Sequence, residues 1–231
     1  MYQTQPIPEI RTPLSRQRVL EAAVALADEG GLEVLTMRNL AQHLGVEAMS
    51  LYYHVENKAA LLDGLVDVIV TEILDEVTTM DGPAPEDDWK AAMRQRILLA
   101  RTVLLRHKWA AALIEQTTSM SVAIISYYEG VLEIFRKGGF SYDLAHHALH
   151  VLGSRALGFT QELFDPGEGS DDASQEMFQQ MADQFPHLVA MLSEIVHEGP
   201  DTTIGWCDDQ TEFEFGLDIL LDGLDRHRQD S

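Results

Sequence analysis

The densest group of metal-ligating side chains in this sequence consists of His146, His147 and His150. A helix would place His146 and His150 on one face, four residues apart, which is a spacing that can chelate a metal ion. Glu162 or a residue of another subunit could complete such a site, and a metal-dependent enzyme is one interpretation of the cluster. The other interpretation, imidazoles that are solvated or lie in an interface, is favoured because no nucleophile elbow, phosphate-binding loop or CxxC motif accompanies them. We therefore predict a protein that is not an enzyme and has no catalytic residue, metal or cofactor.

A second group of functional residues follows a turn at Gly45-Val46, within the stretch "AQHLGVEAMSLYYHVENKAALL" (41–62). Glycine tolerates the positive φ that ends a helix sharply, and the valine after it can pack between the two helices that meet there. Two helices joined by such a turn form a helix-turn-helix, which places its second helix in the major groove of DNA. The spacing alone also fits any compact helical hairpin.

The side chains after the turn favour DNA binding over a simple hairpin. Leu51 is the expected apolar anchor of the second helix, which leaves these neighbours exposed or half-exposed: Ala48, Met49, Ser50, Tyr52, Tyr53 and His54. Serine and tyrosine hydroxyls can contact bases or phosphates, and alanine or methionine can meet a thymine methyl group. Lys58 begins the next helix, where its charge and the backbone amides can contact a phosphate. One of the two tyrosines, Tyr53 more readily than Tyr52, could instead pack against the first helix.

The formal net charge of −22 argues at first against a polyanionic partner. Residues 1–60 hold 5 Lys and Arg and 7 Asp and Glu, so this part of the chain is nearly neutral. The remaining residues hold 11 Lys and Arg and 31 Asp and Glu, so they carry most of the negative charge. Counterion release depends on the phosphates that are neutralised locally, so this distribution permits DNA binding. The acidic remainder should slow the approach to DNA and discourage non-specific binding.

Helices must position these residues, and the pattern of the whole chain is helical. Three prolines mark residues 1–13 as a flexible arm. Ser15, Thr36 and Asn57 are the expected N-caps of the first, second and fourth helices, Gly30-Gly31 is the expected end of the first, and the third spans 47–53. After a break at 78–88, helical patterns recur at 89–106, 119–137, 143–164, 186–197 and 209–227. No segment shows sustained period-two alternation, so we predict an all-α fold.

The bulk composition is that of a cytoplasmic protein. The chain of 231 residues is 45% hydrophobic, which suffices for a substantial core. The single Cys207 excludes an internal disulfide, and no apolar run approaches the roughly 18 residues of a membrane span. The N-terminus lacks the basic start and apolar segment of a secretory signal. We expect a cytoplasmic location and no membrane partner.

The stretch "LTMRNLAQHLGVEAMSLYYHVENKAALLDGL" (35–65) resembles the DNA-binding domain of the TetR (tetracycline-repressor) family of bacterial transcription regulators. The similarity extends back through "SRQRVLEAAVALADEGGLEVL" (15–35), and its most specific part is the block "LGV…LYYHV.NK..LL". The stretch "GGFSYDLAHHALHVLGSRALGFTQELF" (138–164) resembles the C-terminal regulatory domain of that family more loosely. The resemblance implies an N-terminal three-helix helix-turn-helix domain for DNA and a C-terminal helical domain for ligand binding and dimerisation.

The resemblance also implies individual DNA contacts. In this family a homodimer reads a palindromic operator, with one half-site for each recognition helix. Arg38 matches a position that contacts a base, most naturally a guanine. Ala48, Met49 and Ser50 match the other base-facing positions, and Tyr52 matches one that contacts base or backbone. The phosphate-facing positions are matched by Thr36, Tyr53, His54 and Lys58.

In the C-terminal part the resemblance implies a dimer contact and a ligand cavity. The dimer contact corresponds to 143–164 and 209–227, although the apolar side of the latter could simply close the core of the monomer: Phe213, Leu217, Leu220, Leu221 and Leu224. Candidate ligand contacts come from the middle helices and 155–162: Trp109, Leu113, Gln116, Tyr127, Tyr128, Arg155, Phe159 and Glu162. Aromatic residues at helical spacing are more often core than ligand site, so the cavity rests on the resemblance. Most antibiotic contacts of the tetracycline repressor are absent, so we expect a different effector.

Together these observations predict a flexible arm (1–13), a helix-turn-helix DNA-binding domain (14–60) and a ligand-binding and dimerisation domain (61–231). We predict a ligand-responsive transcriptional regulator of the repressor type. It would bind double-stranded DNA at a palindromic operator as a homodimer and be released by a small, largely apolar effector. The alternative is a helical protein that binds a small molecule or a partner and whose DNA-binding head is non-functional. Sparse positive charge and the bland pair Ala48-Met49 leave this alternative open.

Overall fold

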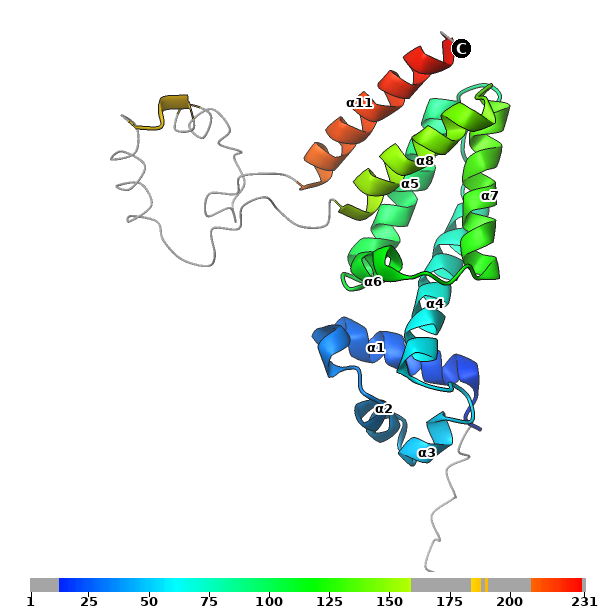
Figure 1. Cartoon of the computed structure of the whole chain (residues 1–231), viewed down its shortest axis with the longest axis vertical. Helices are drawn as coiled ribbons and strands as arrows, with labels where there is room; N and C mark the ends of the chain where they lie inside the picture. Colours follow the sequence, from blue (N-terminus) through cyan, green and yellow to red (C-terminus); the bar gives the residue numbers. More distant parts are fainter. Residues whose placement is uncertain (1–12, 159–183, 188–189, 191–208, 230–231) are drawn as a thin grey trace, which may run out of the picture. The chain divides into compact units, whose positions relative to one another are not determined.

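The computed structural model describes residues 13–158, 184–187, 190 and 209–229, and these residues form helices without any strand (Figure 1). This confirms the predicted all-α fold. The helices are α1 (Arg16–Val34), α2 (Met37–Leu44), α3 (Ala48–Leu51), α4 (Lys58–Thr78), α5 (Trp89–Arg106), α6 (Ala110–Gln116), α7 (Val122–Lys137), α8 (Tyr142–Gly158) and α11 (Asp209–Gln229). Within these ranges no helix has the length and apolarity to cross a membrane. The predicted helix at 186–197 lies almost wholly outside the described residues.

The chain divides into two compact units. One contains the residues up to Pro83 together with Gln95–Ile134, and the other contains Ala84–Arg94 together with the residues from Phe135 onward. The first unit therefore holds α1–α4, α6 and most of α5 and α7. The second holds α8, α11 and the remaining ends of α5 and α7.

Three polar side chains fix the beginnings of α1, α2 and α4. Ser15, Thr36 and Asn57 are N-caps, and each side-chain oxygen accepts a hydrogen bond from the backbone N–H three residues later, at 3.2, 3.1 and 2.9 Å. These bonds satisfy amides that have no partner within the helix. The predicted caps are confirmed.

Glycines bend the chain at both predicted positions. α1 nominally extends to Val34, but Gly30 (φ −144°) and Gly31 (φ 76°) leave helical geometry, so the regular helix ends at this pair. Gly45 has φ 66° and ψ 35°, and its N–H donates to the last carbonyls of α2. A left-handed residue here turns the chain out of α2 and towards α3.

In the first unit, α1, α2, α3 and α4 share an apolar core (Figure 1). Its members include Val19, Leu20, Ala23, Ala27, Leu40, Ala41, Leu51, Leu61 and Leu65. α3 is shorter than the predicted 47–53 because the Leu51 carbonyl accepts hydrogen bonds from the amides of both His54 and Val55, each at 2.9 Å. The chain turns there, buries Val55 and continues to α4.

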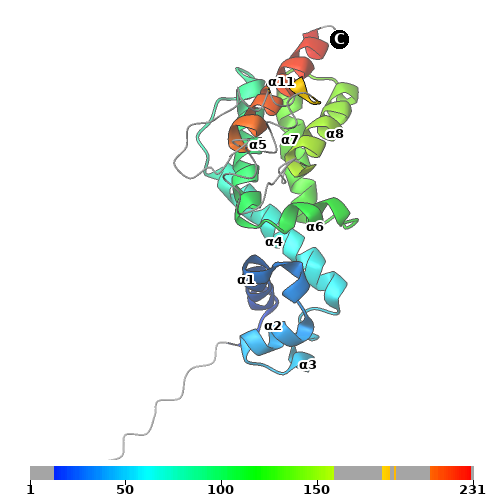
Figure 2. The ribbon, with the colours of Figure 1, turned by 90° about the vertical axis from the view of Figure 1, so that its left-hand side faces the viewer.

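The second unit closes its core with aromatic rings and with α11, which packs against α8 (Figure 2). The ring centroids of Trp89 and Phe140 are 4.5 Å apart, and Phe135 touches both rings. Four of the five apolar residues singled out in 209–227 are buried in this unit: Phe213, Leu217, Leu221 and Leu224. This apolar side of α11 therefore closes the core of the monomer.

Ion pairs fasten α11 to the beginning of α5. Arg94 lies 2.6 Å from a carboxylate oxygen of Glu214 and 2.7 Å from one of Asp218. Trp89 Nε1 donates to Asp225 at 3.1 Å. Burial opposes ionisation of Asp225, but the hydrogen bonds from Trp89 and Arg228 outweigh it and lower the pKa of this carboxyl group.

Candidate functional site

An exposed surface of unusual composition surrounds the turn between α2 and α3. Tyr53 is 87% exposed, Met49 69% and Tyr52 43%, although Leu51 between them is fully buried. Neither tyrosine is buried, so the structure does not show the alternative in which one of them packs against α1. Large apolar and aromatic groups that gather on a surface are typical of an interface with another molecule.

The other predicted DNA contacts are also accessible. Thr36, Arg38 and Lys58 are exposed, and Ala48, Ser50 and His54 are half-buried. We call the nine residues together the reading face: Thr36, Arg38, Ala48, Met49, Ser50, Tyr52, Tyr53, His54 and Lys58. They lie at the start of α2, on α3 with the turn after it, and at the first residue of α4.

Several groups of the reading face have the chemistry to contact DNA. Thr36 Oγ1 accepts the Asn39 amide, which leaves its hydroxyl proton to donate to a phosphate oxygen. Lys58 is the first residue of the 21-residue helix α4, whose N-terminal amides and dipole favour an anion. Arg38 lies in the first turn of α2 and carries the planar fork that can bind guanine through two hydrogen bonds.

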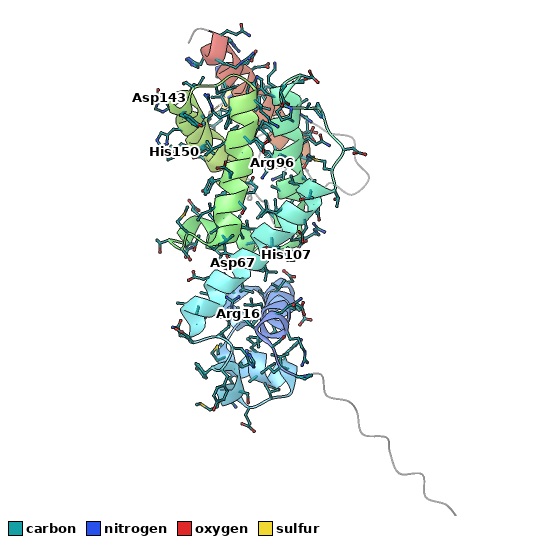
Figure 3. All side chains as sticks on the ribbon, turned by 90° about the vertical axis from the view of Figure 1, so that its right-hand side faces the viewer. Arg16, Asp67, Arg96, His107, Asp143 and His150 are labelled. Atoms are coloured by element: carbon teal, nitrogen blue, oxygen red, sulfur yellow. The ribbon has the colours of Figure 1, made fainter. Side chains whose placement is uncertain are left out.

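A polar junction ties α1 to α4 and to the turn before α6. The Asp28 carboxylate accepts a hydrogen bond from Trp109 Nε1 at 2.7 Å and lies 2.8 Å from His107 Nδ1. The other ring nitrogen of His107 lies 3.3 Å from the carboxylate of Glu72 in α4 (Figure 3). His107 and Trp109 are each only 9% exposed, whereas the side chains of Asp28 and Glu72 are 31% and 32% exposed, so the donors are more shielded from water than the carboxylates. We call Asp28, Glu72, His107 and Trp109 the junction.

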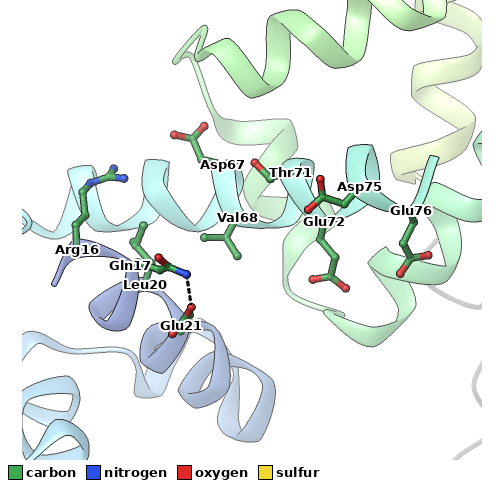
Figure 4. Close-up of a pocket in the computed structure, with 10 residues that line it drawn as sticks. All are labelled: Arg16, Gln17, Leu20, Glu21, Asp67, Val68, Thr71, Glu72, Asp75 and Glu76. Atoms are coloured by element: carbon green, nitrogen blue, oxygen red, sulfur yellow. Dashed lines mark hydrogen bonds between the residues drawn. The ribbon is translucent and has the colours of Figure 1, made fainter. Parts of the chain in front are cut away.

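An open cleft of about 520 Å³ runs along α1 and α4 (Figure 4). Its lining consists of Arg16, Gln17, Leu20, Glu21, Asp67, Val68, Thr71, Glu72, Asp75 and Glu76. Half of these residues carry carboxylates. None of the predicted ligand contacts belongs to this lining.

The predicted ligand contacts have diverse environments. Trp109 and Leu113 are buried, Tyr127 is half-buried, and Gln116 and Tyr128 are exposed. The indole N–H of Trp109 is engaged by Asp28 and is therefore not available to a ligand. Arg155 belongs to the other unit, where its guanidinium donates to the Glu212 carbonyl and lies over the ring of Phe213. Phe159 and Glu162 lie outside the described residues.

Sequence reasoning missed Arg96, Asp28 and His107 as functional candidates. Arg96 is 6% exposed, and its guanidinium lies 4.9 Å from the ring centroid of Tyr127. Burial raises the pKa of the Tyr127 phenol, and the positive charge of Arg96 opposes that shift. The available signal was a basic residue on an apolar face of α5, between Met93 and Ala100. No local signal marks Asp28, because its partner His107 is 79 residues away in sequence.

The histidine cluster lies on the exposed side of α8. His146, His147 and His150 are all exposed, and the ring centroids of His146 and His150 are 4.7 Å apart. Figure 3 labels His150 on α8. Asp143 approaches His147 at 3.9 Å. In the part of the chain that the structure describes, no group of three or more His, Cys, Asp or Glu side chains is arranged to hold a metal ion.

A helix-turn-helix with an accessible reading face, continuous with further helices, defines the class of DNA-binding transcription regulators. Residues 19–65 match the family described as "Bacterial regulatory proteins, tetR family", and residues 82–228 match "Tetracyclin repressor-like, C-terminal domain". The chain therefore belongs to the TetR family, and it is a ligand-responsive, DNA-binding transcriptional regulator. The comparisons give no support to a protein with a non-functional DNA-binding head.

Individual relatives agree with this assignment over nearly the whole chain. The class A tetracycline repressor protein from transposon 1721 of Escherichia coli is 30% identical over 94% of this chain and 93% of its own length. The class C protein of Escherichia coli is 28% identical over 93% of this chain and 92% of its own. Among solved structures, apo ActR from Streptomyces coelicolor superposes with a TM-score of 0.75 at 26% identity, covering 95% of this chain and 98% of that one.

Replacing Asp28 tests whether the junction stabilises the fold. Asp28→Ala leaves the shielded donors of Trp109 and His107 without their acceptor, so we expect the free energy of unfolding to fall by about 1–3 kcal/mol. Asp28→Asn keeps an oxygen acceptor and should cost less. The measurement is urea denaturation followed by circular dichroism. Glu29→Ala, at the exposed neighbouring position, is the control, and an equal loss in Asp28→Ala and Glu29→Ala would contradict the role of the junction.

Proposed function

We propose that the protein is a homodimeric, cytoplasmic repressor that binds a palindromic operator and is released from it by a small, largely apolar effector. Its N-terminal arm is 1–13, which lies almost wholly outside the described residues, its DNA-binding domain is 14–60, its ligand-binding and dimerisation domain is 61–231, and it has no enzymatic activity. The single observation that carries the proposal is the accessible reading face, with its exposed Tyr53, Met49 and Tyr52 on a helix-turn-helix.

Each residue of the reading face has a proposed role at the operator. Arg38 reads a guanine, and Ala48, Met49 and Ser50 meet base edges, with the first two suited to thymine methyl groups. Tyr52 contacts a base or the backbone. The phosphates are contacted by the remaining members of the face: Thr36, Tyr53, His54 and Lys58. Phosphate contacts set the register of the head on DNA, whereas base contacts select the sequence.

Dimerisation through α8 and α11 would hold two DNA-binding domains on one operator. Phe215 and Ile219 lie one turn apart on α11 and are 64% and 54% exposed, and Val151 on α8 is 41% exposed. A second copy packed on these two helices would cover all three side chains in a four-helix contact. Two recognition helices must lie roughly 34 Å apart to enter successive major grooves, so the dimer contact sets the half-site spacing.

Release by an effector requires coupling between the ligand-binding domain and the two DNA-binding domains of the dimer. α4 carries Lys58 at its first residue and Glu72 of the junction four turns later, so movement of α4 shifts the reading face. The effector needs to favour the displaced arrangement by only about 1.4 kcal/mol to lower operator affinity tenfold. ActR, whose structures include complexes with (S)-DNPA and actinorhodin, is a relative that binds small molecules and so supports an effector here.

Substituting Arg38 and Lys58 separates base reading from phosphate contact. Arg38→Ala should weaken binding to the operator by about 1–3 kcal/mol and relax the preference at one base pair. Lys58→Ala should weaken binding to all sequences similarly and reduce the slope of log affinity against log salt by about 1. The assay is fluorescence anisotropy on operator and scrambled duplexes over a range of salt, with the exposed Lys108→Ala as the charge control. Equal losses for Arg38→Ala on both duplexes would refute its base-reading role.

Substituting the apolar pair of α11 tests the proposed dimer. Phe215→Glu with Ile219→Glu should yield monomers in sedimentation velocity, because two carboxylates would be buried in the contact. Operator affinity should fall more than about tenfold, since each head would then bind its half-site alone. Val122→Glu with Ile125→Glu places the same charges on α7, where the side chains are 80% and 51% exposed, and should leave the dimer intact. A stable dimer in the α11 variant would exclude this contact.

A further inference from the structure

Arg96 is a buried cation that has no charged partner among the residues that the structure describes. It is 6% exposed, its Nη2 donates to the Tyr127 carbonyl at 3.2 Å, and its Cζ lies 4.9 Å from the centroid of the Tyr127 ring (Figure 3). Its Nε is fully buried and has no hydrogen-bond partner. None of the ion pairs seen among the described residues includes Arg96. The contacts it has are a carbonyl dipole and an aromatic face, and neither carries a full negative charge.

The space for this guanidinium is made by a glycine. A Cβ on Gly130 of α7 would lie 2.8 Å from Nη2 and 3.1 Å from Nη1 of Arg96, so only glycine lets the guanidinium lie directly against the backbone of α7. Buried apolar side chains flank Arg96 on α5, namely Met93 one turn before it and Ala100 one turn after it. The surroundings are therefore apolar and aromatic, with a single fixed positive charge.

Two other arginines of α5 have carboxylate partners. Arg94, two residues earlier on α5, contacts Glu214 and Asp218, and Arg106 at the end of α5 contacts Glu72 and Glu76. The sequence offers 38 acidic residues against 16 basic ones, so carboxylates are abundant. Burying an ion without a counter-ion is strongly unfavourable, and buried charges in proteins are normally paired. Among the described residues no carboxylate pairs with Arg96, and an anion bound from solution would supply the missing negative charge.

We propose that Arg96 binds the anionic group of the effector, and that the effector is an aromatic organic anion such as a carboxylate or sulfonate. This inference rests on the proposed function, because it specifies the chemical class of the ligand that releases the DNA. The planar guanidinium matches a carboxylate or sulfonate with paired hydrogen bonds, and its Nε supplies a donor for one of them. The ring of Tyr127 and the apolar side chains of α5 receive the aromatic body. The net charge of −22 disfavours anions over the chain as a whole, so an anionic group needs a local positive charge such as that of Arg96.

A matched pair of fluorescent dyes tests the inference on the full-length protein. Anilinonaphthalene sulfonate is an aromatic anion, and phenylnaphthylamine has the same aromatic skeleton without the sulfonate. We expect the anionic dye to bind the wild-type protein about tenfold or more tightly than Arg96→Met, while the neutral dye binds both within about twofold. The affinity of Arg96→Lys for the anionic dye should lie between those of the wild type and Arg96→Met, because lysine keeps the positive charge but lacks the planar guanidinium. Lys108→Met removes an exposed cation and should bind both dyes as the wild type does.

Two results would overturn the inference. One is equal affinity of wild type and Arg96→Met for the anionic dye, and the other is an equal loss for both dyes, which would show that Arg96 acts only through packing. Circular dichroism checks the fold, and Arg96→Gln, which retains a donor for the Tyr127 carbonyl, replaces Arg96→Met if that variant loses helicity. Dye binding needs no DNA. A protein that fails to bind any operator would therefore refute the repressor proposal while the dependence on Arg96 would still stand.

Discussion

The hydrogen bonds of one carboxylate, that of Asp28, are the interaction on which the proposed switch depends. Asp28 lies in α1, which packs against α2 and α4, and it holds the indole of Trp109 and the imidazole of His107. His107 in turn faces Glu72 of α4 with its second nitrogen. His107 therefore links carboxylates of two different helices, α1 and α4. In the proposed switch, a displacement of α4 or α6 would reach the reading face through these contacts.

The distribution of charge explains how so acidic a chain can act on DNA. In the proposed mode of binding, affinity for phosphate comes from a few local groups, chiefly Lys58, Thr36 and the amides at the start of α4, and the acidic remainder limits non-specific attachment. Such a repressor would depend on base contacts and on two half-sites bound together rather than on general attraction to DNA. The proposed role of Arg96 is the reverse, because there a buried cation in an acidic chain would select for an anion.

The features that could be predicted from sequence are those that depend on neighbouring residues. The caps at Ser15, Thr36 and Asn57 and the left-handed Gly45 follow from local backbone chemistry, and burial of Leu51 follows from helical spacing. The end of α3 could not be predicted, because its length depends on how Val55 packs beneath it.

Contacts between distant residues were not predictable from one sequence. Periodicity predicted an apolar side for α11, but it could not decide that Phe213 and Leu217 close the core of the monomer while Phe215 and Ile219 remain exposed. The pairing of Asp28 with Trp109 and the burial of Arg96 against Gly130 arise only when separate helices pack together. The residues predicted to contact a ligand have side chains suited to a cavity. Which of them face a ligand depends on how separate helices pack, and one sequence does not establish this.

Selection of bound duplexes from a random DNA library at about 50 mM salt, where specific and phosphate contacts are both strong, tests the central claim most directly. The account predicts enrichment of an inverted repeat whose half-site centres lie about one helical turn apart, roughly 10–10.5 base pairs. Absence of enrichment, or enrichment of an isolated half-site, from a preparation shown to be folded and dimeric would contradict it.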